Sequence, residues 1–213
     1  SDTQSNPGVA KALAQKAGHA VAIRSNVRGT RARWIEMARN NAALGLKMRA
    51  SSRATIADQL DAVGRELSLG KTPQRIECFD VSHSMGESAV ASCVVLGPEG
   101  PLKSDYRRFN LRNITPGDDY AGIEQAVERR FARVMRGEAP MPDLLLIDGG
   151  LGQLHAAMAA LARVGVTDLA VVSVAKGSDR RAGQERLFFP GQDAALILAA
   201  DSPALRPLPR VRD

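Results

Sequence analysis

The chain has 213 residues, of which 44% are hydrophobic and 24% charged, ordinary values for a folded globular protein. This length suffices for one substantial domain, or for a domain of about 140 residues with a smaller attachment. No stretch approaches the roughly 20 apolar residues of a membrane helix, and the chain does not open with a signal-peptide pattern, so the sequence argues against a membrane or secreted protein.

The formal net charge of +6 is unevenly distributed. Residues 1–75 contain 13 Lys or Arg against 5 Asp or Glu, a balance of +8, whereas residues 76–213 contain 16 against 18, a balance of −2. The cationic surplus therefore belongs to the amino-terminal part. Such a segment can pair with nucleic-acid phosphates, although charge alone favours a solvated basic face equally well.

The only cysteines, Cys78 and Cys93, both lie in apolar runs. Free cysteine commonly packs as a small hydrophobe, and a disulfide between the two is the less favoured alternative. A reducing cytoplasm is the compartment that this pattern favours.

Residues 1–74 are interpreted as a basic lead-in that precedes the main domain. Residues 1–8 are polar and expected to be loose, and the alternation over residues 18–23 predicts a short strand. From there the apolar residues change to a helical period, which predicts a long helix over about 31–67, either continuous or interrupted. Gly70 and Pro73 mark its end.

Residues 75–213 show the pattern of an α/β domain. Three sequential antiparallel strands, a helix, and then a strand, helix, strand alternation are expected. The expected strands cover residues 76–82, 89–96, 102–111, 144–147 and 169–174. The first expected helix buries Ile123, Val127, Phe131 and Val134, and the second covers residues 152–165. Residues 177–191 are expected to form a basic hairpin or loop.

Two of the apolar strands end in an acid, Asp80 and Asp148. Carboxylates in such positions are costly unless they are paired, hydrogen-bonded or bound to a metal, and Mg²⁺ binds through one or two carboxylates together with phosphate oxygens. An Asp at a strand end can equally cap a turn. The coincidence of two such acids makes a metal site and a structural role comparably favoured from the residues alone.

Two further motifs lie near these acids. Residues 149–153 (GGLGQ) form a strand-to-helix turn where backbone amides could approach a phosphate, although glycines there commonly serve only the turn. Asp118 and Asp119 precede a helix, so each is a candidate for its N-cap or for a third carboxylate facing the metal.

Several long stretches of the sequence resemble, in one order, the C-terminal nuclease region of the UvrC family, the incision subunits of bacterial nucleotide excision repair. The resemblance covers about residues 75–206 and, more loosely, the basic helix before them. The stretches are residues 77–87 (ECFDVSHSMGE), 91–95 (ASCVV), 106–110 (YRRFN), 114–120 (ITPGDDY), 146–154 (LIDGGLGQL), 175–177 (AKG) and 201–205 (DSPAL).

The resemblance implies an RNase H-like fold, a mixed five-stranded sheet flanked by helices and preceded by a basic helical segment. It also implies a divalent-metal-dependent endonuclease, using Mg²⁺ or Mn²⁺, that cuts damaged double-stranded DNA on the 5′ side of a lesion. Asp80 and Asp148 match the family's metal-binding carboxylates, and Asp119 matches a third implicated acid. The implied partners are DNA and UvrB, with UvrA upstream, and no membrane.

The family's metal-binding histidine has no match in this chain. It follows an Arg-Asp-Glu-like run, and this chain ends at Arg212 and Asp213, where that run begins. Pro207 and Pro209 stand where the family has helical residues, and proline removes a helix N–H. The resemblance therefore implies an incomplete metal site and poor incision by the isolated chain. His19, His83 and His155 do not match that histidine, and the family's other domains are not recognised here.

Basic residues after the last expected strand, Lys176, Arg180 and Arg181, are candidates for DNA phosphate contacts, although exposed cations are more often simply solvated. Two other functions stay open. One is a non-catalytic DNA-binding or protein-binding fragment of the same protein. The other is a phosphatase or phosphotransferase with Asp80 as the nucleophile.

Overall fold

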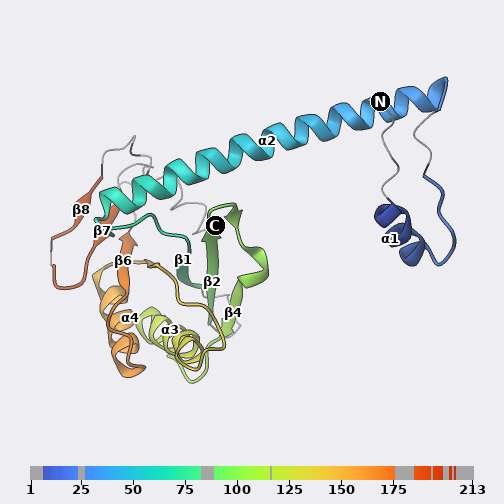
Figure 1. Ribbon diagram of the computed structural model, residues 1–213. Helices are drawn as coiled ribbons and strands as arrows, with labels where there is room; N and C mark the ends of the chain where they lie inside the picture. Colours follow the sequence, from blue (N-terminus) through green and yellow to red (C-terminus); the bar gives the residue numbers. More distant parts are fainter. Residues whose placement is uncertain are drawn as a thin grey trace. The chain divides into compact units, whose positions relative to one another are not determined.

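The computed structural model describes residues 7–23, 27–82, 89–115, 117–175, 185–192, 194–198, 202 and 204 (Figure 1). The chain divides into two compact units, residues 1–52 and residues 53–213. Helix α2 (Thr30–Glu66) begins in the first unit and ends in the second. This division lies within the long helix that the sequence predicts, and the domain boundary placed after residue 74 stays a prediction.

The first unit holds helix α1 (Pro7–Ala17) and the start of α2. The strand expected over residues 18–23 is wrong, because the described residues there form no strand. Gly18 adopts a left-handed conformation (φ 72°) and donates to the Ala14 carbonyl, which ends α1 and turns the chain. Pro7 starts this helix, in a segment expected to be loose, because its fixed φ suits a first helical position.

Helix α2 is continuous over 37 residues, through Gly45 in its middle. Its early large apolar residues are exposed, with Trp34 61% accessible. Later in the helix Ile56, Leu60 and Val63 are buried, at the helical spacing that the sequence shows. No helix in the described part of the chain, α2 included, is both long enough and apolar enough to cross a membrane.

The second unit is built on one mixed sheet, in which the described residues contribute eight strands in the order β3-β2-β1-β5-β6-β7-β8, with β4 also paired to β2. The five predicted strands are β1 (Ile76–Ser82), β2 (Val90–Gly97), β4 (Arg107–Asn110), β5 (Leu144–Asp148) and β6 (Ala170–Ala175). Three shorter ones are added: β3 (Gly100–Pro101), β7 (Arg186–Phe188) and β8 (Leu196–Ile197).

The strand directions agree with the prediction. β2 runs antiparallel to β1 and to β4, whereas β5 is parallel to both β1 and β6. The strand expected over residues 102–111 is shorter than predicted, because residues Lys103–Asp105 form a turn of 3₁₀ helix and pairing with β2 resumes at Arg107.

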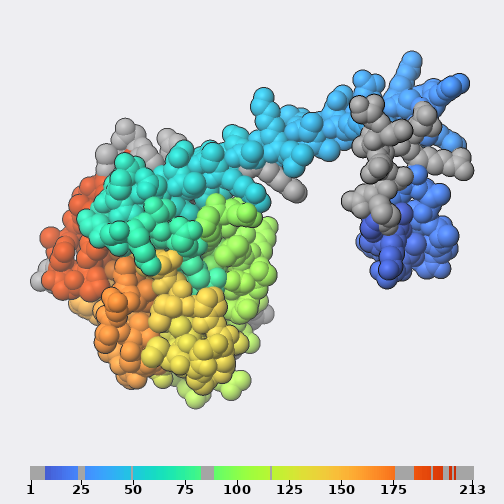
Figure 2. All heavy atoms as spheres, viewed as in Figure 1, coloured from blue at the N-terminus to red at the C-terminus, as the bar shows by residue number. Residues whose placement is uncertain are grey.

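Helices cover both faces of the sheet (Figure 1). Helices α3 (Asp119–Met135) and α4 (Leu151–Arg163) pack on one face, around Phe79, Phe131 and Ile147. In Figure 2 their yellow and orange atoms lie side by side without a gap. The last turns of α2 cover the other face, where they pack in one cluster with Cys78 of β1 and Leu146 of β5.

The two cysteines belong to these different layers. Cys78 packs in the cluster under α2, whereas Cys93 packs in the cluster under α3 and α4, and both are free thiols. Because neighbouring side chains of a strand alternate between faces, the antiparallel pairing of Cys93 with Phe79 keeps Cys93 and Cys78 on opposite sides of the sheet. The structure therefore supports buried free cysteines and not a disulfide.

Candidate active site

Asp80 and Asp148 lie at the carboxyl ends of adjacent parallel strands. The register of β1 and β5 pairs Phe79 with Ile147, and each aspartate is the next residue along its strand. Both are partly exposed where the residues before them are buried, so the two carboxylates emerge from the hydrophobic sheet at one edge. This is the arrangement that the sequence predicts.

A third aspartate lies on the wall of the same cavity. The cavity has a volume of about 260 Å³, and Asp80, Asp119 and Asp148 all line it. The rest of its wall consists of Val81, Ile123, Gly149, Gly150, Gln153 and Ala175. The fold thus gathers three acids from β1, α3 and β5 that are separated by 39 and 29 residues in the chain.

Asp118 and Asp119 have different structural roles. The Asp118 side chain accepts a hydrogen bond of 3.0 Å from the Ala121 amide and is the N-cap of α3. Asp119 is the first residue of the helix and lines the cavity. Of the two roles that the sequence left open, Asp118 has the N-cap, and the metal-facing role of Asp119 stays a prediction.

The turn after Asp148 forms the floor of the cavity. Gln153 Oε1 accepts from the Gly150 amide at 3.0 Å, and the Gly149 amide donates to the Val174 carbonyl at 3.1 Å. A Cβ atom on Gly149 would lie 2.7 Å from Gln153 Cδ and 3.0 Å from its Cβ, so any side chain there would force Gln153 or the turn to shift. The amino end of α4 borders the cavity, a position that favours an anion.

The close packing continues in the first turn of α4. A Cβ atom on Gly152 would lie 2.6 Å from the ring of Tyr120, the second residue of α3. Glycine at this position lets the starts of α3 and α4 approach each other, which brings Asp119 to the turn that follows Asp148.

Oxygen donors of this kind suit Mg²⁺ or Mn²⁺. Among the described residues, however, no group of three or more His, Cys, Asp and Glu side chains is already arranged to hold a metal ion. The three aspartates share one cavity, but they do not form a closed ligand cage.

The other predicted site residues lie elsewhere. Lys176, Arg180 and Arg181 are outside the described residues, as are His83 and the two prolines near the end of the chain. His19 is exposed in the first unit and His155 is exposed on α4, and neither lines the acidic cavity.

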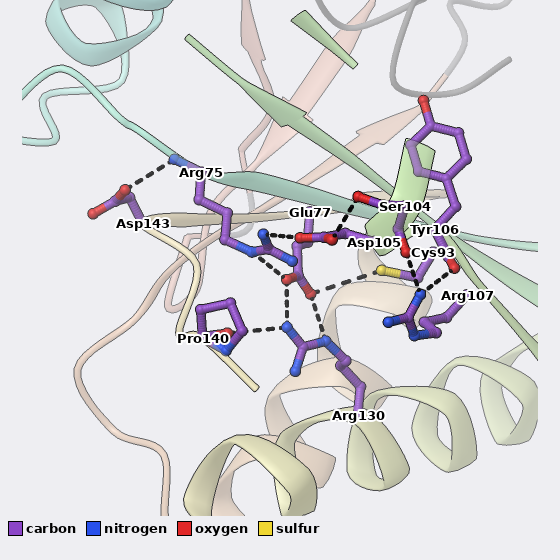
Figure 3. A network of polar contacts seen from close by, with 10 residues as sticks. All are labelled: Arg75, Glu77, Cys93, Ser104, Asp105, Tyr106, Arg107, Arg130, Pro140 and Asp143. Carbon is purple, nitrogen blue, oxygen red and sulfur yellow. Dashed lines mark hydrogen bonds and ion pairs between the residues drawn. The ribbon is translucent and has the colours of Figure 1, made fainter. Parts of the chain in front are cut away.

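A buried charge network at the other end of β1 was not predicted (Figure 3). Glu77 is fully buried and accepts two bonds from Arg130, from Nε at 2.9 Å and from Nη2 at 2.5 Å. Arg75 Nε donates to the same carboxylate at 2.8 Å, and the Cys93 thiol lies 3.7 Å from it. Burial, followed by the nearby Glu77 charge, raises the pKa of the Cys93 thiol well above its usual range.

A second acid fixes the chain just before β5. Asp143 pairs with Lys71 and accepts backbone bonds of 2.9 Å from Gln74 and 3.0 Å from Arg75. Partial burial on its own would raise the pKa of Asp143, but these bonds outweigh that effect and the pKa is lowered. The link between α2 and β1 is thereby tied to the start of β5.

The fold and the site together define a class: a three-layer α/β domain with an acidic cavity at the carboxyl ends of its parallel strands. The family model described as the UvrC RNAse H endonuclease domain matches residues 64–213, and that of the UvrC Ribonuclease H-like domain matches residues 2–49. The chain therefore belongs to the UvrC family.

Relatives in several bacteria carry the name UvrABC system protein C. The protein of Pseudomonas aeruginosa (strain LESB58) is 48% identical over 207 residues, which cover 97% of this chain and 34% of the relative. That of Alkalilimnicola ehrlichii is 49% identical over 204 residues, 95% of this chain and 33% of the relative. The chain thus spans about a third of the length of these relatives.

Solved structures of endonuclease V overlap the chain in part. The human protein is 24% identical and covers 62% of this chain and 59% of its own, with a TM-score of 0.37. The Ciona intestinalis protein, solved with inosine-containing DNA, is 19% identical over 49% and 47% of the two chains, with a TM-score of 0.35. These overlaps are too partial to indicate a function.

Proposed function

We propose that this chain carries a divalent-metal-dependent endonuclease that hydrolyses a DNA phosphodiester on the 5′ side of a lesion during nucleotide excision repair. The observation that carries the proposal is the cavity lined by Asp80, Asp119 and Asp148 in a chain of the UvrC family. Damaged double-stranded DNA is the proposed substrate, and UvrB, with UvrA acting earlier, the proposed partners.

Asp80 and Asp148 would hold the metal ion, Mg²⁺ or Mn²⁺, and Asp119 would contribute a third oxygen from α3. When bound, such an ion polarises a phosphate and lowers the pKa of a coordinated water. Two buried, adjacent parallel strands support the carboxylates and place them at the same edge of the sheet. Beside them, the start of α4 offers a favourable electrostatic environment for a phosphate oxygen.

The test uses Asp80→Asn and Asp148→Asn, which remove charge but preserve shape. Each should abolish Mn²⁺-dependent nicking of a lesion-bearing duplex by the complete enzyme and weaken Mn²⁺ binding by this chain, measured by calorimetry. Asp58→Asn, an exposed residue of α2, is the control and should change neither. Nicking near the wild-type rate by either site variant would refute the assignment, and a labelled strand locates the cut relative to the lesion.

The nicking assay, together with a phosphatase assay, separates the alternatives. A non-catalytic binding fragment would bind DNA but leave it intact at every metal concentration. A phosphatase would instead release product from a small aryl phosphate, which the proposed nuclease should leave untouched.

A further inference from the structure

A second cavity, of about 300 Å³, lies at the opposite end of β1 from the acidic one. Its walls come from the start of β1, from β4, from the second half of α3 and from the segment that follows α3. Six arginines line it, Arg75, Arg107, Arg108, Arg129, Arg130 and Arg133, together with Asp105, Phe109, Glu138, Ala139 and Pro140. We call this the arginine cavity.

Carboxylates neutralise only part of the charge in the arginine cavity. Asp105 and Glu138 pair with Arg75 and Arg133, and the buried Glu77 lies behind the wall. The remaining three lining arginines form no ion pair with any described residue. Of these, Arg107 donates to the carbonyls of Ser104 and Tyr106, Arg129 donates to that of Asn110 and stacks on Phe109, and Arg108 is exposed.

One guanidinium group in the wall is buried and incompletely bonded. The Arg130 side chain is only 6% exposed, its Nε and one Nη atom are used by Glu77 and the Pro140 carbonyl, and its other Nη atom has no hydrogen-bond partner among the described residues. In Figure 3 this nitrogen lies on the side of the guanidinium away from Glu77. This nitrogen is itself buried, so it adds positive charge to the wall of the arginine cavity but is not a contact point for a ligand.

We propose that the arginine cavity binds a backbone phosphate of the DNA, a proposal that rests on the nuclease function above. Phosphate oxygens accept the forked bonds that guanidinium groups donate, and an anion would balance the three arginines that lack acidic partners. The cavity is large enough for one phosphate group and its water, but it is not an enclosed slot for a base.

The phosphate bound here cannot be the one that is cut. Asp119 and Arg130 are eleven residues apart on α3, which corresponds to roughly 16 Å along the helix. Successive base pairs of a duplex rise by about 3.4 Å, so the two cavities would hold phosphates several nucleotides apart. A contact at that distance positions the strand but carries no sequence information, as suits an enzyme that cuts beside lesions in any sequence.

The test measures binding of a fluorescent duplex to the full 213-residue chain without a divalent metal, so that no incision is needed. The variant Arg108→Gln with Arg129→Gln removes two exposed lining cations and leaves the Glu77 network intact. The control Arg65→Gln with Arg163→Gln removes the same charge from exposed positions on α2 and α4 outside the cavity. Circular dichroism verifies that both variants fold.

The cavity variant should bind DNA at least fivefold more weakly than the control, and the slope of log K against log salt should become shallower by about one. Equal affinities for the two variants would overturn the inference even if nicking and the acidic cavity stand. Poly-glutamate serves as a second probe. If the cavity variant binds poly-glutamate more weakly than the control but binds DNA equally well, the inference is overturned in favour of an acidic protein partner. Failure of the wild-type chain to bind DNA would refute this inference. If the wild-type chain binds DNA but shows no nicking in the separate Mn²⁺ assay, only the proposed catalytic function is refuted.

Discussion

Asp118 caps α3 through the Ala121 amide, while its neighbour Asp119 lines the acidic cavity. Replacing one should therefore affect stability, and replacing the other should affect chemistry. Asp118→Ala should lower the free energy of unfolding by about 0.5–2 kcal/mol, the usual effect of losing an N-cap, with incision retained. Asp119→Asn should reduce incision and leave thermal unfolding nearly unchanged. Denaturant titration and a nicking assay on both variants test these expectations. Loss of incision in Asp118→Ala, or loss of stability with retained incision in Asp119→Asn, would contradict them.

The turn below the cavity should distinguish sharply between two adjacent glycines. Gly149→Ser brings Cβ within 3.0 Å of Gln153 Cβ, which belongs to the helix and cannot rotate away, so we expect a loss of about 1–3 kcal/mol and impaired incision. Gly150→Ser is the matched control, because its nearest neighbour would be 3.8 Å away and serine is a good N-cap. Equal unfolding temperatures for the two variants would show that the turn accommodates side chains at both positions.

Glu77→Gln should be among the most destabilising single substitutions in the second unit. The substitution leaves Arg130 and Arg75 without their shared buried carboxylate, and breaking a buried pair in this way costs about 3–5 kcal/mol. The exposed pair of Arg53 and Glu99 provides the comparison, because Glu99→Gln should cost less than about 1 kcal/mol. Urea unfolding curves of both variants measure the difference, and similar midpoints would mean that burial adds nothing to the pair.

Acid should destabilise the fold partly through Asp143. Its folded pKa lies below the ordinary value of 3.8, so the unfolded chain takes up the proton first as the pH falls. The stabilisation is therefore present above about pH 4 and is lost as the pH drops through the folded pKa. In Asp143→Asn the unfolding free energy should be lower at pH 7 and should depend less on pH between 5 and 2. An unchanged acid dependence would show that this carboxylate does not contribute.

Much of the second unit could be predicted from the sequence because its longer strands and helices have local patterns of apolar residues. The continuous apolar run of β5 and the helical spacing of Ile123, Val127 and Phe131 each reflect burial on particular faces. The short strands β3, β7 and β8 could not be predicted in this way, since two or three residues become a strand only when a longer partner lies beside them. The alternation over residues 18–23 misled for the same reason.

The candidate site divides along similar lines. Asp80 and Asp148 were predictable because each ends an apolar strand, and parallel strands that are neighbours bring their ends together. The Glu77 and Arg130 pair was not, because its members are 53 residues apart and only the packing of α3 on β1 joins them. An acid near the start of a buried strand was the available signal, since such a charge requires a partner.

The parallel pairing of β1 with β5 also has a consequence for the order in which the protein is made. Asp80 leaves the ribosome long before Asp148, and β5 is held between β1 and β6, the latter ending at Ala175. Contacts between distant parts of a chain form late, after the entropy of closing the intervening loop has been overcome. The acidic cavity therefore forms only when most of the second unit has been synthesised, and a nascent chain that ends before residue 148 cannot yet bring Asp80 and Asp148 together.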